Sequence, residues 1–168
     1  MSVRLWPETL YNSNGGVVIP DTGWLLMGAF CGPFTGYSII QLDVELALAN
    51  SGHQIVSVIL EDFDTEEVYA QWNLDSDDLS APADWVELVC EVPFTYTGGY
   101  LIAGISKVSG SSGTVVWRHR DDGEGNILRQ TKIWGVMLPF KPKSPTPSNA
   151  ATGKSLNTAT LSWQAGTS

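Results

Sequence analysis

The chain has 168 residues, of which 43% are hydrophobic and 16% charged, a composition that favours a folded domain over a disordered polar segment. Lys and Arg total 9 against 18 Asp and Glu, so the net charge is -9. Such a surface repels phosphates, which argues against nucleic acid and anionic membranes and favours neutral partners, cations and basic protein patches. No apolar run is long enough to span a bilayer.

Nearly every segment alternates apolar and polar residues with a period of two, the pattern of half-buried strands. Two short strands are predicted near the N-terminus, at 16–20 and 23–30. The longer ones are predicted at 40–48, 54–63, 67–74, 84–94, 100–108, 113–119 and 131–140. About eight such strands with frequent Gly turns, and no convincing helix, predict an all-β fold, an antiparallel β-sandwich.

The strand at 40–48 shows the alternation most clearly. Its core-facing side chains are predicted to be Ile40, Leu42, Val44, Leu46 and Leu48. In the strand at 84–94 the core-facing set is predicted to be Val86, Leu88, Cys90 and Val92. The strand at 100–108 is apolar on both faces, so we expect it to lie centrally in its sheet.

The composition changes after Phe140, which predicts three parts. Residues 1–140 form the sandwich, residues 141–155 form an extended Pro/Ser-rich linker, and residues 156–168 hold one further strand. A single strand cannot bury its own face, so it either begins a further module or completes the sheet of a neighbour by strand addition.

The C-terminal part resembles the opening of a fibronectin type III-like or bacterial Ig-like module. The matching residues are Pro147, Asn149, Ala151, Thr152, Gly153, Leu161, Ser162 and Trp163. The resemblance implies that Trp163 serves the core of this second module.

Residues 1–140 resemble jelly-roll modules, related in shape to carbohydrate-binding modules, of repeat-rich surface and phage appendage proteins. The matching segments are YSIIQLDVELALAN, SAPADWVELVCEVPF, FTYTGGYLIAGISKVSG and TVVWRHRDDG. The resemblance implies a fold of jelly-roll type and a setting in a larger protein, and it transfers no ligand.

The sequence predicts no enzymatic activity. His53 falls in a predicted turn and His119 at a strand end, and none of the nucleophile-elbow, zinc-protease, P-loop or dinucleotide motifs is present. Glu87 and Glu91 could pair as carboxylates, but they share the polar face of one strand, which favours a solvated surface. Cys31 and Cys90, the only cysteines, are either bridged or two buried free thiols.

No cofactor is expected except a structural calcium ion, which takes six to eight oxygen ligands. The loop DDGEGN offers Asp121, Asp122, Glu124 and Asn126, with glycines that permit a sharp turn. A second acidic stretch offers Asp62, Asp64, Glu66 and Glu67, together with Asp75, Asp77 and Asp78. Neither stretch has EF-hand spacing.

Glycan binding is the sharpest functional hypothesis, because sugars stack their apolar faces on exposed aromatic rings. The candidate glycan-binding residues are Trp117, Trp85, Trp72, Tyr69 and Arg118. The competing interpretation of each Trp is burial in the core, which is its usual place in sandwiches.

We therefore expect a non-catalytic binding or assembly module of a virion appendage, capsid decoration or cell-surface filament protein, with a role in adhesion and with glycans as ligands. The alternative is a carbohydrate-binding accessory module of a secreted glycan-active enzyme. Expected partners are copies of the chain, other surface or virion proteins and glycans, without nucleic acid or membrane insertion. The expected location is extracellular, on a virion or cell surface. The N-terminus lacks a secretory signal, which places that signal outside this sequence or implies release by lysis.

Overall fold

A computed structural model of the chain describes residues 1–7, 11–27, 31–79, 83–121, 123, 127–139, 145–146 and 162–163. The chain divides into two units, Met1–Met137 and Leu138–Ser168. The strands of the first unit are β1 (Ser2–Trp6), β2 (Gly15–Val18), β3 (Leu25–Leu26), β4 (Tyr37–Leu48), β5 (Gln54–Asp62), β6 (Val68–Asp75), β7 (Asp84–Phe94), β8 (Leu101–Gly110), β9 (Val115–Asp121), β10 (Ile127–Arg129) and β11 (Thr131–Met137).

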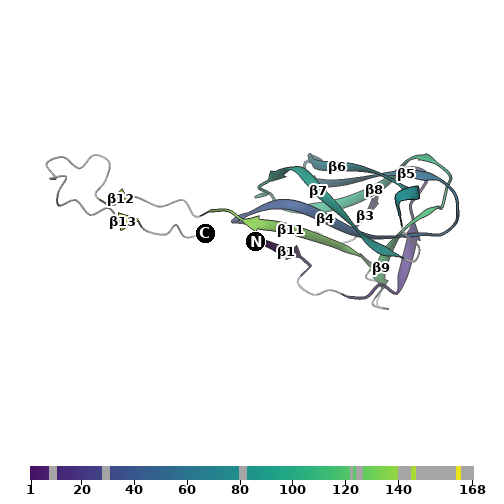
Figure 1. The fold of residues 1–168 in the computed structure, drawn as a ribbon, viewed down its shortest axis with the longest axis horizontal. Coiled ribbons are helices and arrows are strands. Elements are labelled where there is room, and N and C mark those ends of the chain that lie inside the picture. Colours follow the sequence, from purple (N-terminus) through teal and green to yellow (C-terminus); the bar gives the residue numbers. More distant parts are fainter. Residues whose placement is uncertain are drawn as a thin grey trace. The chain divides into compact units, whose positions relative to one another are not determined.

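These strands form two packed antiparallel sheets, which confirms the predicted β-sandwich. Figure 1 shows β6, β5 and β8 in one layer and β4, β11 and β1 in the other. The smaller sheet has the order β3-β8-β5-β6. In the larger sheet β4 pairs with β7 on one side, and with β11 and then β9 along the other.

The strand order is that of a jelly roll once two interrupted strands are recognised. β1 pairs with β11 and β2 pairs with β9, so β1 and β2 together occupy one edge position. β11 and β9 share the next position, beside β4. The larger sheet then reads β1/β2, β11/β9, β4, β7, and from β2 to β9 the chain crosses between the sheets at every connection except that from β5 to β6, as in a jelly roll.

A β-bulge in β4 corrects one predicted alternation. Ile39 and Gln41 are paired on both sides of the strand, while Ile40 is skipped in the register. The extra residue reverses the alternation, because it shifts the following side chains by one position. Ile39 is therefore fully buried and Ile40 only half-buried, whereas Leu42, Val44 and Leu46 face the core as predicted.

The core lies between the sheets and is mostly aliphatic. Its fully buried members include Ile39, Leu42, Leu46, Leu60, Leu101, Ile105, Trp117 and Ile133. β8 lies between β3 and β5 with both of its faces buried near its start, which confirms its predicted central place. Val92, predicted to face the core, is exposed because regular pairing of β7 with β4 ends at Val89.

The described residues contain one helical turn, the 3-10 turn Ser76–Asp78, which Asp75 caps by accepting a hydrogen bond from the backbone N–H of Asp77. Among them, no helix is long and apolar enough to cross a membrane. In the second unit, β12 (Pro145–Thr146) pairs antiparallel with β13 (Ser162–Trp163). β12 falls within the predicted linker and β13 within the predicted further strand, and the module-like resemblance of this part stays a prediction.

Candidate binding pocket

Trp117, the first glycan candidate, is a correction. Its side chain is 0% exposed, and its indole Nε1 donates a hydrogen bond to the carbonyl of Gln130 at 3.1 Å. The alternation of β9 places Trp117 on the inner face of the larger sheet, two residues after buried Val115. A ring enclosed in the core cannot stack on a sugar, so the competing interpretation of burial holds for this residue.

The other four candidates are scattered over the sandwich. Trp72 packs against the core and donates from Nε1 to the carbonyl of Val89 at 2.8 Å. Tyr69 also packs against the core, and its ring stacks on Phe94 at 4.9 Å between centroids.

Trp85 and Arg118 lie on the outward face of the larger sheet. The ammonium of Lys132 lies 3.5 Å from the centroid of the Trp85 ring and covers one of its faces. Arg118 lies across from Gly16 on β2. The five predicted glycan-binding residues therefore do not form one site.

A pocket of about 520 Å³ lies elsewhere, where β1 and the residues that follow it meet the segment between β3 and β4. Its apolar lining includes Leu5, Trp6, Tyr11, Met27, Phe34 and Leu128. Its polar lining is Arg129, Gln130 and Thr131, from the junction of β10 and β11.

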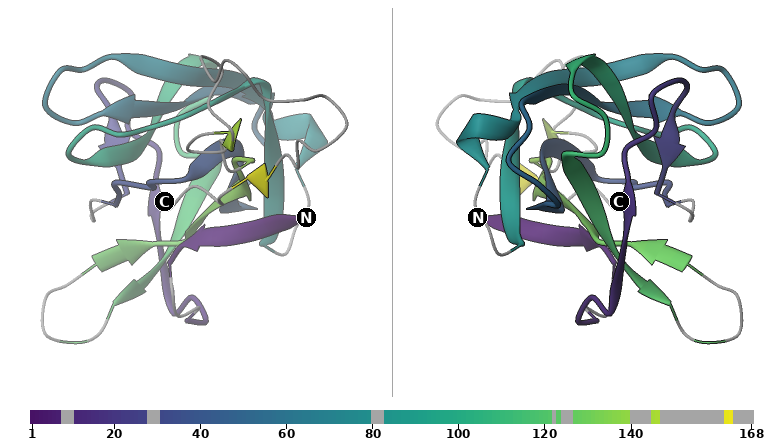
Figure 2. Two further views of the ribbon diagram at one scale, coloured as in Figure 1. Left: turned by 90° about the vertical axis from the view of Figure 1, so that its left-hand side faces the viewer. Right: turned by 90° about the vertical axis from the view of Figure 1, so that its right-hand side faces the viewer.

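The interruption of the edge strand explains why the pocket is here. Among the described residues, β1 ends at Trp6 and β2 begins at Gly15, and no described strand pairs with the β10–β11 junction from that side. The end of β9 leaves β4 and pairs with β10 instead, as the projecting two-stranded arm in Figure 2 shows. The backbone N–H of Arg129 donates to the carbonyl of Met27 at 3.1 Å, which fixes the β3 side of the pocket to β10.

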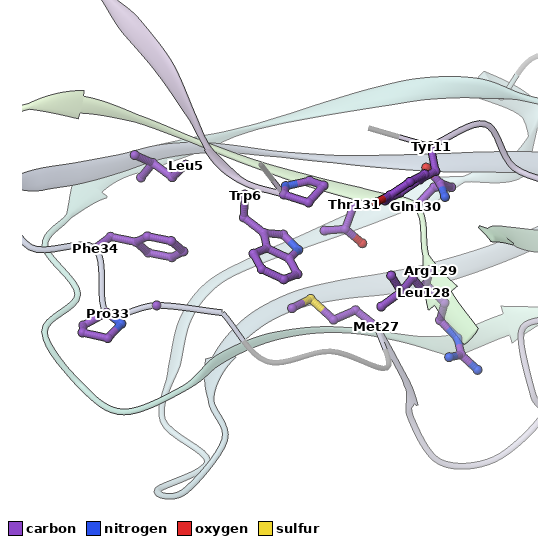
Figure 3. A pocket seen from close by; sticks show the side chains of 12 residues that line it. Leu5, Trp6, Tyr11, Met27, Pro33, Phe34, Leu128, Arg129, Gln130 and Thr131 are labelled. Atoms are coloured by element: carbon purple, nitrogen blue, oxygen red, sulfur yellow. The ribbon is translucent and has the colours of Figure 1, made fainter. Parts of the chain in front are cut away.

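Aromatic rings occupy the middle and one side of the pocket. Figure 3 shows the indole of Trp6 projecting from β1 into the middle, with Phe34 to one side of it and Thr131 to the other. Tyr11 lies on the same side as Thr131 and is 52% exposed. Trp6 and Tyr11 were not predicted as binding residues, because both fall outside the alternating segments from which strands were predicted.

Two polar atoms of the pocket lining are buried without a hydrogen-bond partner. They are the Oγ1 hydroxyl of Thr131 and the Nε of Arg129. Thr131 is 3% exposed and pairs with Val44, whose inward orientation it shares. Buried polar groups are nearly always partnered in folded proteins, so two unpartnered atoms in one pocket indicate a place where a ligand or water completes the bonding.

His119 on β9 lies next to this polar lining but is not part of it. It pairs with Arg129 across the β9–β10 arm, and its Nδ1 is also buried without a partner. Burial lowers the pKa of His119, and the positive charge of Arg129 lowers it further. Burial likewise lowers the pKa of the Arg129 guanidinium. At neutral pH the His119 imidazole is therefore neutral and lies beside the cationic guanidinium of Arg129.

The outward face of the larger sheet is also rich in aromatic and polar groups, and although the Nε of Arg118 is buried there without a partner, the carboxylate of Asp43 is fully bonded. The buried carboxylate of Asp43 accepts from Trp134 Nε1 at 2.7 Å and from Gln41 Nε2 at 2.6 Å. Because these groups already bond one another, a ligand would have to break existing bonds to gain its own.

The predicted calcium loop lies largely outside the described residues. Asp122, Glu124 and Asn126 are not described, and the Oδ1 of Asp121 accepts from the backbone N–H of Gly123. In the second stretch, Asp62 accepts from the backbone N–H groups of Asp64 and Thr65 and from the Tyr96 hydroxyl. These bonds, led by the one from Thr65, lower the pKa of Asp62 and stabilise its turn.

One other cluster among the described residues could hold a cation. His53, Asp75 and Asp77 each place a ligand atom within 4.8 Å of the others. Calcium takes six to eight oxygen ligands, so this exposed cluster supplies too few for the structural calcium site that the sequence suggested.

Cys31 and Cys90 are free and buried, which settles the alternative left open by the sequence in favour of two thiols. Burial raises the pKa of Cys31 to about 12 and that of Cys90 to about 11. Only a thiolate is a strong nucleophile, so neither side chain is prepared for covalent catalysis.

In comparisons with protein-family models, with curated proteins and with solved structures, no match to this chain was found.

Proposed function

We propose that this jelly roll is a non-catalytic binding module that holds a saccharide in the pocket between β1, the β3–β4 segment and the β10–β11 junction. The observation that carries the proposal is the pairing of aromatic rings with unpartnered buried polar atoms in one pocket. The rings are those of Trp6 and Tyr11, and the atoms are Thr131 Oγ1 and Arg129 Nε.

The size and lining of the pocket support a small organic ligand. Ligand pockets usually enclose about 300 to 1,000 Å³ and are mostly apolar with a few placed polar groups. A sugar ring has the matching character, because its C–H face suits an aromatic ring while its hydroxyls both donate and accept hydrogen bonds. The Thr131 hydroxyl can serve either role, and Gln130 also lines the pocket.

A virion appendage or cell-surface protein is the setting we propose for this module, with saccharide binding as its contribution to attachment. The composition and the resemblance to jelly-roll modules support this setting. The alternative setting, an accessory module of a secreted glycan-active enzyme, predicts the same pocket ligand. The two differ in whether the parent protein releases sugar from a polymer.

A glycan array followed by calorimetry on the full chain tests the proposal. We expect binding to a subset of saccharides, and a loss of roughly five- to ten-fold in affinity for Tyr11→Ala, equivalent to about 1 kcal/mol from one ring contact. Tyr11 is chosen because it is exposed, so its truncation leaves the core intact.

Trp24→Ala is the matched control, because it also removes one exposed aromatic ring. Trp24 is 46% exposed and lies over Gly104 of β8, and it does not line the pocket. We expect Trp24→Ala to bind like the unaltered chain. An array that stays blank at high protein concentration, or equal losses in the two variants, would refute the pocket as a saccharide site.

A further inference from the structure

We propose that the saccharide bound in this pocket is acidic, and that its carboxylate is bound by Arg129 with His119 beside it. This inference rests on the proposed function, because it names the class of saccharide that the same pocket takes. It is carried by Arg129, a cationic side chain that lines the pocket and has a buried Nε without a hydrogen-bond partner.

The cationic residues are unevenly placed for a chain with a net charge of -9. Of its four arginines, three lie on the β9–β10 arm, namely Arg118, Arg120 and Arg129. Among the described residues, the two ion pairs join His53 to Asp75 and Lys107 to Asp21, so neither uses an arginine of this arm.

Arg129 is the member of this group that lines the pocket. Figure 3 shows it at the end of the pocket away from Phe34, next to Leu128. Its Nε is buried without a hydrogen-bond partner, and burial lowers its pKa, so its charge is partly desolvated. A guanidinium presents parallel N–H donors that match the two oxygens of a carboxylate, and a bound carboxylate would restore the bonding that burial removes.

His119 is the neighbour of Arg129 on the arm and lies outside the pocket lining. It lies directly across from Arg129 on the neighbouring strand, on the same face of the arm. The His119 imidazole packs against Gly15 of β2, where any larger residue would collide with it. Burial lowers the pKa of His119, so the imidazole is neutral at pH 7 and Arg129 is the cationic member of this pair.

The charge of the whole chain favours a carboxylate over a phosphate. A carboxylate carries one negative charge, whereas a phosphate monoester carries nearly two at neutral pH. A chain with a net charge of -9 repels the second more strongly, and one guanidinium beside a neutral imidazole compensates a single charge.

Matched sugar pairs test the inference on the full chain. We use methyl glycosides of glucose, galactose and mannose, each beside its uronic acid, which differs only by oxidation of C6 to a carboxylate. Lactose beside sialyllactose forms a fourth pair. In the pair with the preferred ring, we expect the acidic member to bind at least ten-fold more tightly by nuclear magnetic resonance titration.

Arg129→Gln should reduce this acid preference to less than three-fold, and because the preference is a ratio within one sugar pair, a loss of affinity shared by both members does not affect it. Arg120→Gln is the matched control, because it removes the same charge from the same arm. Arg120 lies one position along β9 from His119, so strand alternation turns it to the opposite face. This control should retain the full preference, and melting curves of both variants confirm that they are folded.

The outcomes separate the two proposals. Equal binding of the acidic and neutral members of every pair overturns the inference but agrees with the proposed saccharide pocket. The inference also fails if a sulfated sugar binds while every uronic acid and sialyllactose fail, or if both variants lose the preference equally. A chain that binds no sugar of either kind overturns the inference together with the proposed function.

Discussion

Thr131→Val is expected to stabilise the protein, although it removes a polar group from the binding pocket. Thr131 begins β11, is 3% exposed and has an Oγ1 without a hydrogen-bond partner. Valine has nearly the same shape and suits a strand, so the change replaces a buried hydroxyl with a methyl group and little else.

The size of the effect follows from the desolvation of that hydroxyl. Leaving a buried polar group unpartnered costs about 1 to 3 kcal/mol relative to partnering it. Removing the group recovers part of this cost, so we expect the free energy of unfolding to rise by about 1 kcal/mol. For a unit of this length, that gain raises the melting temperature by about 4 °C.

Thr114→Val is the matched control, with the opposite expected sign. Thr114 is 0% exposed, and its Oγ1 donates to the side-chain oxygen of Asn50 at 3.0 Å. The substitution breaks this bond and leaves the Asn50 oxygen with one donor fewer. We therefore expect a loss of about 1 kcal/mol from the same chemical change.

Urea denaturation followed by tryptophan fluorescence measures both variants. The reasoning is wrong if Thr131→Val lowers the free energy of unfolding by as much as Thr114→Val does, since that result would mean that the Thr131 hydroxyl is already partnered. The same variant should bind saccharide roughly five- to ten-fold more weakly, as expected for one lost hydrogen bond of about 1 kcal/mol. Gained stability with lost affinity is the signature of a residue kept for binding.

Three further predictions concern other parts of the chain. Cys31 and Cys90 should react slowly with a thiol reagent at pH 8 and rapidly after unfolding, because burial raises both pKa values. Nuclear magnetic resonance should find the pKa of His53 above about 6.5 and that of His119 below it. His53 then stabilises the fold fully below about pH 6.5 and less as the pH rises through its folded pKa, whereas His119 weakens the fold as the pH falls below about 6.5. Removal of the residues after Lys143 should leave the melting temperature of the sandwich nearly unchanged, because the first unit ends before them.

Much of the fold could be predicted from the sequence, because burial of one face leaves a period-two signal in each strand. The strands predicted at 54–63 and 84–94 agree with β5 and β7 to within a residue. The pattern failed at Ile40 of β4, because both neighbouring strands, β11 and β7, pair with Ile39 and Gln41 and leave Ile40 unpaired. A bulge of this kind depends on partner strands that are distant in sequence, so local alternation does not reveal it.

The candidate site could not be predicted by the same reasoning. The aromatic residues predicted to bind a glycan all lie within strands. Strand alternation places some of these, such as Trp117, in the core. The aromatic residues that line the pocket include Trp6, the last residue of β1, and Tyr11, which lies beyond it. Their approach to Thr131 joins residues more than a hundred positions apart, which only the strand order of the larger sheet brings about.

Buried polar groups of the larger sheet differ in how completely they are hydrogen-bonded. On the outward face, Asp43 has both carboxylate oxygens bonded, by Trp134 and Gln41, and this closed network needs no further partner. On the inward face, Arg129 and Thr131 have buried atoms with nothing to bond. Arg118 on the outward face and Gln54 in the smaller sheet also have buried atoms without a partner, so an unpartnered atom alone does not mark a binding site. The support for the proposed ligand is that two such atoms lie in one pocket with the rings of Trp6 and Tyr11.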